Sequence, residues 1–223
     1  MAEPEKRRGE ATREAILAAA EAAFAEHGFD GARVDTIAEA SGYNKTLIFR
    51  YFGDKLGLYT EVLKRADREV DALLARVFAS LLEDEITSDT RRFRAFLEMM
   101  VRTMFDYLFE HPRLVRILTW EMAESWQTFH QVASQFPPEN VEQFEMFFER
   151  ARSAGLLQSD FMPTLQFSTI TQMCLGYLAS LPLYQVLLPK EDLSSVGSIA
   201  QAREYIVNFA VAGIMTSSHR DEI

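Results

Sequence analysis

The sequence predicts an all-α protein, and three observations support this fold class. Nearly every segment places its apolar residues at helical spacing, and no segment alternates apolar and polar residues on both sides of a hairpin dipeptide. The 223 residues, 48% of them hydrophobic, are enough to bury a sizeable core without disulfides or a structural metal. The single cysteine, Cys174, leaves no internal disulfide framework and suits a reducing compartment.

Four helices are expected in the first part of the chain, at about 10–27, 34–41, 44–52 and 55–82. Gly28 is placed to end the first helix, and Gly42 breaks the second. Asn44 and Asp54 are residue types that cap helix N-termini, so they mark the starts of the third and fourth helices. The fourth helix is long enough to link two domains, which we expect to comprise residues 1–54 and 55–223.

Five further helices are expected at about 93–108, 113–133, 139–154, 163–188 and 200–218. The acidic stretch Glu83–Thr90 is expected to form a loop before them. His111 and Pro112 end one helix and begin the next, and Pro137–Pro138 interrupts the chain again. The second domain is therefore expected to be helical throughout.

The segment Arg33–Tyr51 has the spacing of a helix-turn-helix. Ala38, Gly42 and Ile48 stand at offsets of four and ten residues. The small residue lets two helices approach, the glycine permits a left-handed turn, and the isoleucine anchors the second helix in the core. On this interpretation Asn44–Phe52 is a recognition helix that enters a DNA major groove.

The net charge of −10 by itself argues against a nucleic-acid partner, because DNA binding depends on lysine and arginine. The distribution of charge alters that conclusion. Between Tyr43 and Lys55 three basic residues face only one acidic residue, Asp54. This segment is therefore the part of the chain suited to a polyanion.

The expected DNA contacts lie in and beside the recognition helix. Lys45 and Thr46 are expected at base edges, and Arg50 and Lys55 at flanking phosphates. The alternative is that the charged residues are solvated surface groups and that Tyr51 packs against the core. The full set of candidate DNA-binding residues is Arg33, Thr36, Tyr43, Asn44, Lys45, Thr46, Leu47, Phe49, Arg50, Tyr51 and Lys55.

With these residues assembled, the chain resembles the TetR family of transcriptional regulators. The resemblance rests on Arg13, Ile16, Leu17, Ala19, Ala20, Phe24, Gly28 and Phe29, then Val34, Ile37, Ala38, Ser41 and Gly42, then Asn44, Lys45, Ile48, Phe49, Tyr51, Phe52, Lys55 and Leu58. It covers about the first sixty residues closely, and the likeness beyond them is architectural. The resemblance implies a homodimer that binds a palindromic operator as a repressor and is released when a small ligand enters the second domain.

The chain departs from the family's usual residues at Arg33, Thr46, Leu47, Phe49 and Gly57. Phe49 replaces a tyrosine and so has no phenolic hydroxyl to donate to a phosphate. Leu47 replaces a threonine, which favours apolar contact with a thymine methyl group over a polar base contact. The operator sequence of a relative therefore does not transfer to this chain.

The second domain contains more large flexible apolar side chains than one thin helical layer needs, which indicates an apolar cavity. The candidate effector-binding residues are Met100, Met104, Trp120, Met122, Trp126, Phe129, Phe147 and Met173. We expect a small apolar or aromatic effector, although most side chains of this kind belong to a core. Glu121 is expected on a solvated face, as glutamates usually are.

Two long stretches, 161–189 and 205–218, carry no charged residue. The first contains Pro163, Pro182 and several glutamines, which a lipid-facing helix would rarely combine, so a protein-covered helix is expected. Helices that are polar on no face are buried on every face. The two stretches are therefore expected to form a homodimer interface through the last two helices, and an intramolecular core is the alternative.

The sequence contains no motif that indicates a catalytic, cofactor or metal site. No glycine-rich phosphate loop, histidine pair at metal spacing or nucleophile elbow occurs, and Asp84 and Glu85 lie in the acidic loop. No catalytic residue, metal or cofactor is expected. A helical enzyme or protein-interaction module is the alternative function. The N-terminus has no apolar segment behind its charges, so a cytoplasmic protein is expected.

Overall fold

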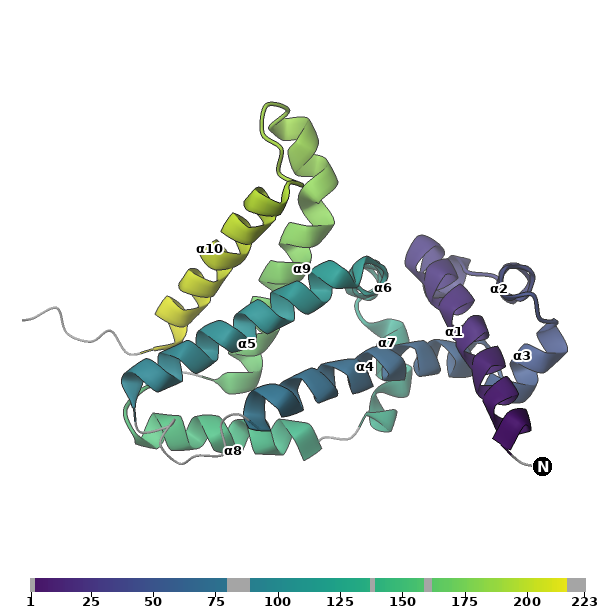
Figure 1. Cartoon of the computed structure of the whole chain (residues 1–223), viewed down its shortest axis with the longest axis horizontal. Coiled ribbons are helices and arrows are strands. Elements are labelled where there is room, and N and C mark those ends of the chain that lie inside the picture. The colour runs from purple at the N-terminus through teal and green to yellow at the C-terminus, as the bar shows by residue number, and fades with distance from the viewer. Residues whose placement is uncertain (1–2, 80–88, 137–138, 159–161, 216–223) are drawn as a thin grey trace, which may run out of the picture. The chain divides into compact units, whose positions relative to one another are not determined.

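The structure is a computed structural model that describes residues 3–79, 89–136, 139–158 and 162–215 (Figure 1). Within these ranges every regular element is a helix, apart from one isolated antiparallel bridge between Leu157 and Met215. The predicted all-α class is confirmed. The chain divides into two compact units, one of Met1–Val70 with His111–Phe136 and the other of Asp71–Glu110 with Pro137–Ile223.

The first unit contains α1 (Glu3–Gly31), α2 (Val34–Ser41), α3 (Lys45–Phe52), the first part of α4 (Lys55–Ala79), α6 (Pro112–Ala123), α7 (Gln127–Val132) and the 3-10 helix η2 (Ala133–Gln135). The second unit contains the rest of α4, α5 (Thr90–Glu110), α8 (Glu139–Ser153), α9 (Pro163–Leu187) and α10 (Val196–Ile214).

Aromatic side chains from α1 and α4 form the centre of the first unit. The buried ring of Tyr59 lies edge-on to Phe24, with 4.9 Å between ring centroids, and to Phe29, with 5.2 Å. Leu58 and Leu63 are buried in the same core. This packing explains why the compact unit extends past residue 54, where the sequence placed a domain boundary.

Helix α6 packs along α1. Nε of Arg116 donates a hydrogen bond to the carbonyl of Ala25 at 2.8 Å, and Ile117 is buried in the shared core. At Gly28 the backbone of α1 leaves the helical region, with φ 68° and ψ −177°. A methyl group on Gly28 would lie 3.1 Å from Cδ2 of Trp120, so the glycine lets this indole cover the end of α1.

The single helix expected over 113–133 is wrong. Helix α6 ends at Ala123 and α7 begins at Gln127, because Ser125 and Trp126 adopt positive φ values of 58° and 59°, which an α-helix does not allow. The carbonyl of Glu121 accepts the Trp126 N–H at 2.7 Å and closes the turn. The apolar spacing continues across the turn, so the sequence pattern did not reveal it.

Helix α1 extends beyond both ends of the expected 10–27, from Glu3 to Gly31, whereas two predicted caps agree with the structure. Asn44 accepts a hydrogen bond from the Leu47 N–H at 2.8 Å, and Asp54 accepts one from the Gly57 N–H at 2.7 Å, so both predicted caps are confirmed. Helix α10 begins at Val196 instead of residue 200, with Ser195 as its cap. Most of the expected loop at 83–90, Pro137–Pro138 and the last residues of the expected helix at 200–218 lie outside the described ranges.

Helices α5, α8, α9 and α10 build the second unit. Phe93 and Phe96 of α5 pack against Phe148 of α8, and Phe148 in turn packs against Phe167 of α9 at 5.2 Å between centroids. Residues 163–187 of the uncharged stretch form α9. None of the described helices combines the length and apolarity needed to cross a membrane.

Candidate nucleic-acid interface and ligand pocket

Helices α2 and α3 form the predicted helix-turn-helix (Figure 1). Gly42 takes a left-handed φ of 75° between them and donates its N–H to the Glu39 carbonyl. Ile37 of α2 and Ile48 of α3 have no exposed surface and join the core of the first unit. The turn and the buried anchors therefore fix one face of α3 inward and leave the opposite face in solvent.

The eleven candidate DNA-binding residues all lie in this part of the first unit. Those exposed are Arg33, Thr36, Asn44, Lys45, Thr46, Phe49, Arg50 and Tyr51, and those partly buried are Tyr43, Leu47 and Lys55. The exposed set includes both residues expected at base edges. The structure thus brings the candidates together on and beside one short helix.

Lys45 is engaged by a neighbour that the sequence analysis did not single out. Its Nζ lies 3.0 Å from Oδ1 and 3.2 Å from Oδ2 of Asp35, which belongs to the first turn of α2. The same Nζ is 5.9 Å from the ring centroid of Phe49. A separation of ten residues across a turn gives no periodic signal, so this pair was not predictable from spacing.

Lys55 has a different environment. Its Nζ donates a hydrogen bond to the carbonyl of Asp30 at 3.1 Å and lies 4.7 Å from the ring centroid of Phe29. Both partners are neutral, so the ammonium charge is not cancelled within the pair. A cation of this kind at the start of α4 is suited to a phosphate.

The two candidate tyrosines lie against the beginning of α1. The Tyr43 hydroxyl oxygen is 3.3 Å from Oγ1 of Thr12, and a methyl group on Gly9 would lie 3.5 Å from the Tyr51 hydroxyl oxygen. The Tyr51 hydroxyl approaches α1, as packing against the protein would require. Its side chain nevertheless stays exposed, as contact with DNA would require. The approach of these two tyrosines to α1 was not predicted, because no local motif marks it.

A buried polar network joins α4, α6 and α7 within the first unit. Glu121 is only 1% exposed; it accepts a 2.5 Å hydrogen bond from the Tyr59 hydroxyl and a 3.1 Å bond from the Phe129 N–H. The expectation of a solvated Glu121 is therefore wrong, because these two donors satisfy its carboxylate inside the protein. Burial, and next the hydrogen bond from Tyr59 to Glu121, raise the pKa of Tyr59 well above its ordinary value.

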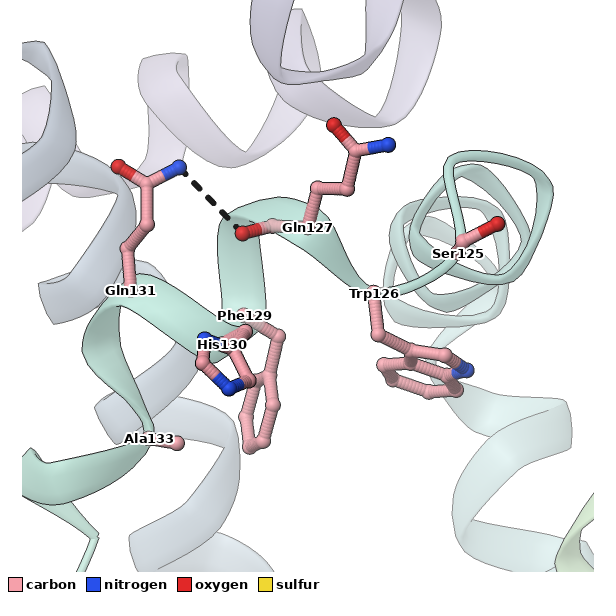
Figure 2. Close-up of a pocket in the computed structure, with 7 residues that line it drawn as sticks. All are labelled: Ser125, Trp126, Gln127, Phe129, His130, Gln131 and Ala133. Carbon is pink, nitrogen blue, oxygen red and sulfur yellow. Dashed lines mark hydrogen bonds between the residues drawn. The ribbon is translucent and has the colours of Figure 1, made fainter.

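A surface pocket of about 560 Å³ opens beside the turn between α6 and α7. Figure 2 shows its lining residues, which are Ser125, Trp126, Gln127, Phe129, His130, Gln131 and Ala133. Trp126 and Phe129 present aromatic rings with centroids 5.9 Å apart. Gln127, Gln131 and His130 add polar side chains to the lining, and Nε2 of Gln131 donates a hydrogen bond to the Gln127 carbonyl at 3.3 Å. The pocket thus combines aromatic rings with a few polar groups.

The eight candidate effector residues are divided between the two units. Trp126 and Phe129 line the pocket, and Trp120 and Met122 are exposed elsewhere in the first unit; in the second unit Met100 is buried and Met104, Phe147 and Met173 are partly buried. Trp120 covers Gly28, as described above. The structure therefore brings two of the eight together in a pocket and gives Met100 the environment of a core residue.

Comparisons with known proteins match both parts of the chain. The family model for "Bacterial regulatory proteins, tetR family" matches residues 16–62, and the model for "Tetracyclin repressor-like, C-terminal domain" matches residues 94–209. The two matches thus cover the helix-turn-helix and much of the remaining chain.

Two curated relatives are transcriptional repressors. The repressor SCO4008 of Streptomyces coelicolor is 36% identical over 115 residues, which are 52% of this chain and 52% of that protein. The repressor NicS of Pseudomonas putida is 28% identical over 170 residues, 74% of this chain and 75% of that protein. The match thus spans about half the length of the first relative and three quarters of the second.

A solved structure supports the same architecture. The crystal structure of SCO4942 from Streptomyces coelicolor superposes with a TM-score of 0.62 at 25% identity, over 91% of this chain and 98% of that one. The likeness extends over both compact units.

Proposed function

We propose that this chain, which belongs to the TetR family of bacterial regulatory proteins, is a DNA-binding transcriptional repressor and not an enzyme. It binds a palindromic operator as a homodimer. The exposed face of α3 carries this proposal, because it presents Lys45, Thr46 and Arg50 while Ile48 anchors the helix. A helix held in this way enters a major groove with its first residues at the base edges. Because the proposed partner is the bacterial operator, we propose that the protein acts in the cytoplasm.

Selection of bound duplexes from a random pool, followed by sequencing, tests the proposal. At physiological salt, where non-specific affinity is weak, the full chain should enrich a two-fold symmetric motif. Two recognition helices of a dimer would sit roughly 34–36 Å apart to reach successive major grooves. An enriched motif without symmetry would count against the homodimer, and a pool without any enriched motif would count against specific DNA binding.

Exposed apolar side chains on α9 and α10 support the homodimer. Val186 is 75% exposed, and Leu183 and Leu187 of α9 and Tyr205 and Phe209 of α10 are exposed as well. The sequence predicted that both helices are buried on every face. In a single chain, however, part of their apolar surface is exposed to solvent. A second copy placed about a two-fold axis would cover the same residues on both subunits.

The proposed effector is a small apolar compound with an aromatic ring. The pocket beside α7 supports this class, since Trp126 and Phe129 offer ring faces and edges while the imidazole of His130 offers a hydrogen bond. We retain Met100, Met104, Trp120, Met122, Phe147 and Met173 as further candidates for the effector site. Thermal-shift screening with hydrophobic aromatic compounds tests the class, and stabilisation by no member would contradict it.

Release of DNA requires that the effector favour one of two states of the protein. The Glu121 network supports a coupling between the pocket and α4 within the first unit. Phe129 lines the pocket, and Tyr59 lies on α4 beside Phe24 and Phe29. An effector that displaces α7 would alter the hydrogen bonds that hold α4. We propose that α4 then changes the separation of the two recognition helices and lowers operator affinity.

A further inference from the structure

The contact between Asp35 and Lys45 lies inside the proposed DNA-binding surface. Asp35 is the second residue of α2 and Lys45 is the first residue of α3, so the pair bridges the two helices of the motif. Both carboxylate oxygens lie within hydrogen-bond distance of Nζ, at 3.0 and 3.2 Å. The ammonium is therefore held between the carboxylate and the edge of α3, with the Phe49 ring 5.9 Å away.

The Asp35–Lys45 pair is exposed to solvent, which limits its contribution to folding stability. The side chain of Asp35 is 76% exposed and that of Lys45 is 47% exposed, and exposed ion pairs contribute little to folding stability. The pair matters more for how Lys45 interacts with the phosphates of DNA. A carboxylate beside the ammonium cancels the charge that would otherwise release counterions from a phosphate. In the described part of the chain the contacts of Lys55 are with a backbone carbonyl and a phenyl ring, and neither carries a compensating charge.

We propose that Asp35 determines specificity by making Lys45 a reader of a guanine edge instead of a phosphate contact. An ammonium has three N–H donors, and the carboxylate of Asp35 engages it with both oxygens. The remaining donor capacity suits the neutral acceptors O6 and N7 of guanine in the major groove. A phosphate approaching the same ammonium would meet the negative charge of Asp35 as well. This inference rests on the proposed binding of operator DNA by α3.

The test compares wild type with Asp35→Asn, Lys45→Ala and Lys55→Ala in two measurements, sequence selection and the salt dependence of affinity for a non-specific duplex. Asp35→Asn should steepen the slope of log affinity against log salt by about one unit per subunit, since it frees a cation for phosphate. It should also lower the preference for guanine at one position of each half-site by about tenfold. Asp35→Glu, a separate variant that keeps the carboxylate, should have the same slope as wild type.

The lysine variants provide the matched contrast. Lys45→Ala should lose the guanine preference and leave the slope nearly unchanged, because on this proposal the Lys45 ammonium contacts a base edge and Asp35 and releases no counterion from a phosphate. Lys55→Ala should keep the motif and flatten the slope by about one unit per subunit. Circular dichroism melting of each variant confirms folding, which substitution of these solvent-accessible groups should preserve.

Two results would overturn the inference while leaving the proposed function intact. In the first, wild type selects a symmetric motif but Asp35→Asn changes neither the motif nor the slope. In the second, Lys45→Ala flattens the slope as much as Lys55→Ala does, which would make Lys45 a phosphate contact. If wild type enriched no sequence at any salt, the proposed function itself would fail, and this inference with it.

Discussion

At the scale of single residues, Glu121 shows how a buried charge is accommodated. Glutamate is seldom fully buried unless its oxygens are satisfied, and here a tyrosine hydroxyl and a backbone N–H each donate to one carboxylate oxygen. Removing either donor leaves a desolvated oxygen with no replacement from solvent, which costs more than the hydrogen bond contributes when it is made. The network therefore makes the first unit sensitive to small changes at Tyr59.

Tyr59→Phe should lower the free energy of unfolding by about 1–3 kcal/mol, because one oxygen of Glu121 loses its donor. Urea unfolding at neutral pH in the absence of DNA measures this change, with Tyr51→Phe on the exposed face of α3 as the control. A Tyr59→Phe variant as stable as wild type would contradict the hydrogen bond.

The raised pKa of Tyr59 also predicts a pH dependence. Folding holds this phenol protonated, whereas in the unfolded chain it ionises near pH 10. The stability that Tyr59 contributes is therefore fully present below about pH 10 and is lost as pH rises toward the folded-state pKa. The difference in unfolding free energy between wild type and Tyr59→Phe should shrink above that pH. A difference that grew with pH would reverse the assigned direction.

Gly28 offers a second prediction at the residue scale. Gly28→Ala would place a methyl group 3.1 Å from the Trp120 ring. The backbone at this residue has φ 68° and ψ −177°, a conformation that essentially only glycine adopts and that costs another residue about 1–3 kcal/mol. Thermal unfolding should show clear destabilisation. Gly197→Ala, in the first turn of α10 with open space around it, should be neutral or stabilising. Equal effects of the two substitutions would argue against the role assigned to Gly28.

At the scale of secondary-structure elements, α9 and α10 differ from the other helices in what their apolar residues contact. Helix α5 buries Phe93 and Phe96 within its own unit, whereas α9 and α10 leave several large apolar side chains in solvent. Ion pairs join α10 to α5, from Arg102 to Glu204 at 2.7 Å and from Arg203 to Asp106 at 2.9 Å. One side of α10 is thus fixed by charge within the chain, and its exposed apolar residues remain available to a partner.

Substituting aspartate on this apolar surface should dissociate the proposed dimer. Burial of a large apolar side chain contributes about 1.5–3 kcal/mol, so Leu187→Asp or Phe209→Asp should raise the dimer dissociation constant more than tenfold and weaken operator binding with it. Sedimentation at micromolar concentration measures the oligomeric state. Met146→Asp, at an exposed residue of α8, is the matched control. Dimers that persist in both α9 and α10 variants would place the interface elsewhere.

At the scale of the whole molecule, the proposed regulation is a coupling between two binding events. Linkage requires that an effector which lowers operator affinity by a given factor bind the operator-free protein more tightly by the same factor. The pocket and the helix-turn-helix both belong to the first unit, and the Glu121 network connects α7 with α4 inside it. This arrangement gives the coupling a physical element that both ligands can bias.

A compound found by thermal-shift screening should satisfy this reciprocity, with a factor of about 5–150 in both directions. Titration calorimetry with and without operator measures the two affinities. Trp126→Ala should remove the stabilisation that the compound gives, because the pocket loses its largest aromatic face, while Met146→Ala should retain it. An unchanged thermal shift in Trp126→Ala would move the effector site away from α7.

The sequence alone determined the features that depend on local spacing and on single residue types. The helix-turn-helix was predictable because Ala38, Gly42 and Ile48 have steric roles that few other residues fill at those positions. The caps Asn44 and Asp54 were predictable because a short side-chain oxygen must satisfy free N–H groups at a helix start. The all-α class followed from apolar periodicity along the whole chain.

Only the tertiary structure decided which groups from distant segments meet. The contact of Asp35 with Lys45, the burial of Glu121 by Tyr59, and the break at Ser125 and Trp126 depend on how packed helices place side chains. Linear spacing carries no information on such neighbours: a glutamate on an apparently polar face reads as solvated until a tyrosine from another helix is seen to reach it. Residue types and periodicity fix what each segment forms, and packing fixes which polar groups find partners.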